Sequence, residues 1–138
     1  MLSLETAKRL KDAGLKWEPQ YGDIMTSMYD GFKDNSYVLD EYLVIDKEFI
    51  EDYPALKPDE LKEFRKWAIF LPRLDQLLDE IAGRGYVWKL RSRADGKYFV
   101  ALFGKNDENY LVQRYWAEAD SPEEAAAAAL IWILEQEA

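Results

Sequence analysis

The chain has 138 residues, 49% of them apolar and 33% charged, which is enough for one domain with its own core. It contains no Cys and no His, which excludes disulfides, thiolate nucleophiles, metal sites built on either residue and a His proton shuttle. No apolar run reaches the roughly 18 residues of a membrane span, and no signal-peptide pattern opens the chain. We therefore expect a single domain over residues 1–138, without cofactor, catalytic residue or membrane partner, in the cytoplasm of a bacterial host cell.

The net charge of −9 is unevenly distributed. Residues 21–63 carry 12 acids and 4 bases, residues 84–114 carry 7 bases and 3 acids, and residues 115–138 carry 6 acids and no base. An acidic chain repels nucleic acid and anionic membranes at long range. Nucleic acid is therefore not the partner we expect first, and only the local basic stretch keeps it open.

The first half of the chain predicts short elements. A helix begins after Ser3, a good N-cap, and ends at Gly14. The segment 23–29 is bounded by turn residues and is predicted as a strand, and residues 36–46 form a second β-rich stretch. After an acidic stretch, Pro58 opens a helix that we expect to run to about Trp67.

The second half has stronger signals. After Pro72, leucines and an isoleucine recur at helical spacing until Gly83. Three strands are predicted next, over 86–93, 97–103 and 110–117. The middle strand is apolar on both faces, so it requires a cover on both sides, one of which could be another molecule.

The last helix is predicted from Ser121 as N-cap, with Pro122 at its first position and Glu124 as a capping-box residue. Five consecutive large apolar residues then circle the helix: Leu130, Ile131, Trp132, Ile133 and Leu134. Such a helix is buried, either as core against the N-terminal half or by self-association with a second subunit. The expected class is α+β, with an antiparallel sheet sandwiched by helices in α/β/α layers.

Carboxylates are the abundant titratable groups, and six of them cluster within residues 40–52: Asp40, Glu41, Asp46, Glu48, Glu51 and Asp52. Hard cations such as Mg²⁺ and Ca²⁺ prefer several oxygen ligands, which would suit a metal site. The spacing matches no calcium-binding loop, however. The alternative is a solvated acidic face.

The bases of the first predicted strand share one face: Lys89, Arg91 and Arg93. Neighbouring Phe99 and Tyr115 could supply stacking surfaces. Basic residues interleaved with aromatic residues on a sheet are typical of single-strand nucleic-acid binding. The alternative is that these bases neutralise the acidic residues within the same fold.

Three runs carry a resemblance: TAKRLKDAG at 6–14, LPRL at 71–74 and AEADSPEEA at 117–125. On these runs the chain resembles small phage- and prophage-encoded proteins of unknown function. Its second half is similar to the phage α/β/α (ABA) sandwich domain. The resemblance implies a phage setting and that fold, and it supplies no functional residue.

Three functions remain open from the sequence. The first is a non-enzymatic phage or prophage accessory protein that acts by contact with an unidentified protein or, as a homo-oligomer, with itself. The second is a nucleic-acid role, either single-strand binding by residues 84–97 or acidic mimicry of DNA that inhibits a DNA-binding protein. The third is a carboxylate-metal enzyme.

Overall fold

The computed structural model describes residues 2–17, 23–27, 37–40, 43–46, 51–52 and 68–138. The chain divides into two compact units, each described by itself below. Unit 1 comprises Met1–Gly14 and Arg73–Ala138, and unit 2 comprises Leu15–Pro72. The single domain over residues 1–138 stays a prediction. The helix predicted over 58–67 lies outside the described residues.

Unit 2 contains a five-stranded antiparallel sheet in the order β4-β3-β2-β1-β5. Its strands are β1 (Ile24–Ser27), β2 (Tyr37–Asp40), β3 (Leu43–Asp46), β4 (Glu51–Asp52) and β5 (Ala68–Phe70). The predicted β-stretch 36–46 is confirmed as the antiparallel pair β2–β3. Beside the sheet, the Trp17 ring stacks on Phe70 at 5.0 Å between centroids, and its indole N–H donates to Asp23 at 2.8 Å.

Unit 1 holds the elements that the second half of the sequence predicts. The helices are α1 (Leu4–Asp12), α3 (Leu74–Gly83) and α4 (Pro122–Glu137), and the strands are β6 (Val87–Ser92), β7 (Tyr98–Lys105) and β8 (Leu111–Ala119). The strands form an antiparallel sheet in the order β6-β7-β8. Gly96, at a φ of 83°, closes the first hairpin as its Asp-Gly turn predicts.

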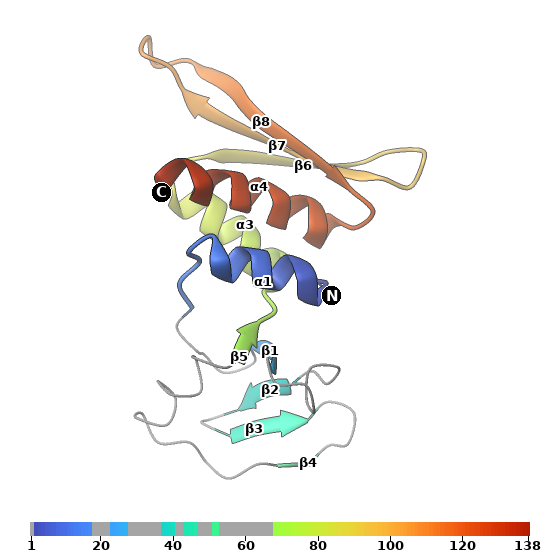
Figure 1. Ribbon diagram of the computed structural model, residues 1–138. Coiled ribbons are helices and arrows are strands. Elements are labelled where there is room, and N and C mark those ends of the chain that lie inside the picture. The colour runs from blue at the N-terminus through green and yellow to red at the C-terminus, as the bar shows by residue number, and fades with distance from the viewer. Residues whose placement is uncertain (1, 18–22, 28–36, 41–42, 47–50, 53–67) are drawn as a thin grey trace. The chain divides into compact units, whose positions relative to one another are not determined.

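The helices of unit 1 pack on one face of this sheet (Figure 1). Helix α4 lies against β7 and β8, α3 contacts α4 and β6, and α1 packs on α4. The α+β class, with an antiparallel sheet packed with helices, is confirmed. The order of layers within unit 1 is sheet, then α3 and α4, then α1. No described helix of this unit covers the second face of the sheet.

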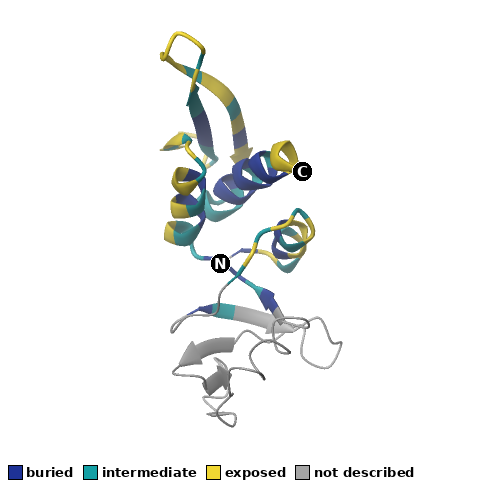
Figure 2. Cartoon of the chain, turned by 90° about the vertical axis from the view of Figure 1, so that its left-hand side faces the viewer, coloured by how far each residue is buried: buried dark blue, intermediate teal, exposed yellow. Residues whose placement is uncertain are grey.

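The core of unit 1 is centred on α4, which is buried over most of its length (Figure 2). The Ala-rich first half of α4 lets neighbouring backbones approach closely, and the larger residues that follow fill the space between sheet and helices. Four of the five predicted apolar residues are buried: Leu130, Ile131, Ile133 and Leu134. The fifth, Trp132, stacks on Tyr115 of β8 at 4.8 Å. The fold of unit 1 itself covers this segment, and the four buried side chains offer no surface to a second subunit.

Glu124 joins the first turns of α1 and α4. Ser121 caps α4 by accepting from the Glu124 backbone N–H at 3.2 Å, as predicted. The Glu124 side chain does not complete the predicted capping box. Its carboxylate instead accepts from the Thr6 hydroxyl at 2.6 Å and from the Ser3 backbone N–H at 2.8 Å. A long-range pairing with α1 thus replaces the local one.

This pairing predicts a pH-dependent stability. Burial by itself raises the pKa of Glu124, but the hydrogen bonds from Thr6 and Ser3 outweigh it and lower the pKa below its usual value. A lowered folded-state pKa contributes stability above the unfolded pKa, and that stability is lost as the pH falls through the folded value. Glu124→Gln should therefore lower the free energy of unfolding by about 1 kcal/mol at neutral pH, and by less in acid.

Urea unfolding at about pH 7 and about pH 3 measures this difference. Glu123→Gln is the matched control, since it removes the neighbouring acid of the same helical turn. An equal loss of stability in both variants would mean that the link to α1 contributes nothing.

Candidate contact surface on the open face of the sheet

The second face of the β6-β7-β8 sheet is built from three paired rows. Val87 pairs with Phe103, Lys89 with Ala101, and Arg91 with Phe99. On the other side of β7 the same rows continue into β8. The outer face is defined by these nine residues: Val87, Lys89, Arg91, Phe99, Ala101, Phe103, Gln113, Trp116 and Glu118. A bulge between Leu102 and Phe103 shifts the register of β8, which brings the even-numbered Trp116 onto the face.

The outer face carries aromatic side chains that are partly exposed. Trp116 keeps 53% of its surface exposed and meets the edge of Phe99 at 6.4 Å between ring centroids. The Lys89 ammonium lies 5.3 Å from the Phe103 ring centroid, within the range of a cation–π contact. Ala101 is buried, and Val87 is 47% exposed. Large apolar side chains left open to water beside charged ones are typical of an interaction surface.

The outer face explains the double-sided apolar pattern of β7. Val100 and Leu102 are fully buried on the face that α4 covers. Phe99 and Phe103 point to the other face, where they are only partly buried. The sequence predicts that β7 needs a second cover, and the described part of unit 1 does not provide one.

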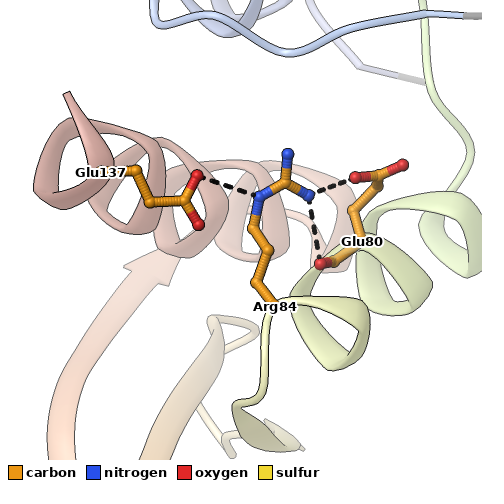
Figure 3. A network of polar contacts seen from close by, with 3 residues as sticks. All are labelled: Glu80, Arg84 and Glu137. Carbon is orange, nitrogen blue, oxygen red and sulfur yellow. Dashed lines mark hydrogen bonds and ion pairs between the residues drawn. The ribbon is translucent and has the colours of Figure 1, made fainter.

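Some of the bases within residues 84–97 form ion pairs with carboxylates of the same chain, and others do not. Arg84 bonds Glu80 and Glu137 and so joins the ends of α3 and α4 (Figure 3). Burial lowers the Arg84 pKa, but these two carboxylates raise it above its usual value. Lys97 pairs with Asp120 at 2.6 Å. Both residues are thus held by carboxylates of the same chain.

Arg93 is also paired, with Asp95 at 3.2 Å and with Glu118 at 3.1 Å. Lys89 rests over Phe103. Arg91 is exposed, and within the described ranges no carboxylate pairs with it. Of the three bases predicted to share a face, Lys89 and Arg91 are therefore the two that no described carboxylate neutralises.

Of the two aromatic residues predicted to stack beside the bases, one lies on the outer face and the other lies on the opposite face of the sheet. Phe99 lies on the outer face beside Arg91. Tyr115 lies on the opposite face, where it stacks on Trp132. Trp116 was missed as a surface residue because the alternation of β8 changes parity at its bulge. The bulge follows from the pairing of β7 with β8, and no local signal in the sequence indicates it.

The acidic segment 40–52 lies largely outside the described residues, which there cover the backbone of β2, β3 and β4 only. The metal site and the DNA mimicry predicted for it stay predictions. Across the parts of the chain that the structure describes, no three acidic side chains are grouped so that they could hold a metal ion. Nor does any described helix combine the length and apolar character needed to cross a membrane.

No protein-family model, no curated protein and no solved structure matched this chain. Its function is therefore inferred from the outer face.

Proposed function

We propose that this chain is a non-enzymatic accessory protein that acts by protein–protein contact through the outer face. In the setting that the sequence resemblance implies, it works in the cytoplasm of a bacterial cell that carries a phage or prophage. The observation that carries the proposal is the exposed aromatic pair of the face, in which Trp116 packs on Phe99. Tryptophan, aromatic and arginine side chains contribute most of the binding energy in protein interfaces.

The charges around this pair favour a protein over a nucleic acid. Binding to a polyanion depends on several free cations that replace counterions. Here Asp95 and Glu118 neutralise Arg93, so that Lys89 and Arg91 are the only bases among the nine residues of the outer face. The net charge of −9 opposes a polyanion further. Single-strand binding through Phe99, Trp116 and Arg91 is the second candidate, and the same experiment distinguishes it.

Affinity capture from a bacterial lysate, with and without nuclease, tests the proposal. Wild-type protein should retain a protein partner that survives nuclease treatment. Val87→Lys should lose that partner, because it places a charge in the apolar part of the outer face. Tyr110→Lys is the matched control, since Tyr110 is 66% exposed in the turn before β8 and lies outside the face.

Two outcomes would contradict the proposal. Equal recovery by wild type and Val87→Lys would mean that contact occurs elsewhere on the molecule. Recovery that depends on intact nucleic acid, and that is lost in Arg91→Glu, would favour single-strand binding instead.

A further inference from the structure

We infer that the outer face binds the outer face of a second copy, in a dimer whose two-fold axis runs along β7. This inference rests on the proposed function and names the partner. It follows from the arrangement of charges on the face. Among the nine residues of the face, the two bases Lys89 and Arg91 lie on the edge strand β6, whereas the exposed Trp116 and the carboxylate of Glu118 lie on the opposite edge strand, β8.

The strand register makes this face complementary to itself. Rotation by half a turn about an axis along β7 exchanges the positions of β6 and β8 and keeps each row at the same height. Arg91 and Glu118 belong to one row, because both flank Phe99. Each Arg91 would then face Glu118 of the second copy, and the reverse contact would repeat by symmetry. The Glu118 carboxylate, which Arg93 of its own chain binds at 3.1 Å, would then lie between two guanidinium groups.

The middle row gives a second match. Lys89 and Trp116 both flank Ala101. The same rotation brings Lys89 over the indole of Trp116 in the second copy, which is the preferred aromatic partner of a cation. Ala101 faces its own counterpart, and its small side chain leaves room for the aromatic rings above and below it in β7.

Charge also disfavours the other simple arrangement. A two-fold axis that runs across the strands through the middle row would place β6 over β6 and reverse the rows, so that Lys89 would face Lys89 of the second copy. Like charges at close range oppose association. The axis along β7 is therefore the arrangement that the side chains favour.

The size of the face determines how tight this dimer is. Three strands about 4.8 Å apart give a narrow face, and two such sheets pack about 10 Å apart with their side chains interdigitated. Small interfaces of this kind are typical of weak or transient complexes. We expect a reversible dimer whose population depends on protein concentration.

Charge exchange tests the inference by analytical ultracentrifugation over a concentration series. Arg91→Glu and Glu118→Arg should each weaken the dimer by about tenfold or more, because each places like charges in contact. The double variant Arg91→Glu/Glu118→Arg should restore association, since the pair then forms in reverse. Arg9→Glu is the matched control, with the same charge change on the exposed side of α1.

The outcomes are distinct. Dissociation in both single variants and recovery in the double variant would support the dimer, provided that thermal melts show folded variants. A wild-type protein that stays monomeric at every concentration would overturn it, as would a double variant that fails to recover. In either case, the affinity capture described above still tests the proposed function separately. If a partner survives nuclease treatment and is lost in Val87→Lys, the proposed function stands, with a different protein as the partner.

Discussion

Leu130→Ala is expected to lower the free energy of unfolding by about 3–5 kcal/mol, the largest effect of any substitution considered. Leu130 is fully buried in α4, which packs against the β6-β7-β8 sheet on one side, against α1 on the other and beside α3. Shortening the side chain leaves a cavity that three packed layers cannot readily fill. Domains of this size have total stabilities of about 5–15 kcal/mol, so the loss takes a large fraction. Urea unfolding followed by circular dichroism measures it.

Leu111→Ala makes the same chemical change at an exposed position. Leu111 keeps 53% of its surface exposed at the start of β8, and we expect a loss below about 1 kcal/mol. Similar losses at the two leucines would mean that α4 is not the centre of the core. Self-association through the segment that contains Leu130 would then become the better explanation of its apolar sequence.

Trp116→Ala is expected to have the second-largest effect, on association and not on stability. We expect at least about a 30-fold weaker contact through the outer face, as for a tryptophan near the centre of an interface. The stability of the isolated chain should change by less than about 1 kcal/mol, because more than half of the side chain is already exposed. Ultracentrifugation and urea unfolding of the same sample separate the two effects.

Tyr110→Ala is the control for this prediction, since it removes an even more exposed aromatic ring outside the face. It should leave association unchanged. A Trp116→Ala variant that unfolds easily would show that Trp116 belongs to the core. A stable variant with unchanged association would remove Trp116 from the contact surface.

Local signals in the sequence were sufficient to predict most of unit 1. Ser121 and Pro122 mark the start of α4, and the Asp-Gly turn before Lys97 marks the β6–β7 hairpin. Each of these signals acts over a few residues, so it does not depend on the rest of the fold. The strand and helix boundaries in this unit accordingly agree with the prediction within one or two residues.

Features that depend on distant residues could not be predicted in this way. Glu124 had a local partner in its capping box, but α1 brings Thr6 and Ser3 to it from 118 and 121 residues away. Strand β5 (Ala68–Phe70) is only three residues long and gains its identity from pairing with β1. The sequence of such a short segment carries too little periodicity to indicate a strand.

The candidate surface was predicted in part. The apolar pattern of β7 indicated a second cover, and the shared face of Lys89 and Arg91 followed from the alternation of β6. The bulge in β8, and with it the position of Trp116, depends on cross-strand pairing. Pairing of Arg93 with Glu118 likewise needs the sheet to form, which is why the sequence left three bases equally available for nucleic acid.

Hydroxyl-radical footprinting, read out residue by residue with mass spectrometry, tests most directly whether the outer face is the contact surface. The dilute chain is compared with the assembled species, whether dimer or captured complex. The account predicts strong protection of Trp116 and Phe99 on assembly, with Tyr110 labelled as before. Equal labelling of Trp116 in both samples would contradict it, because the exposed aromatic pair of the face would then remain in water.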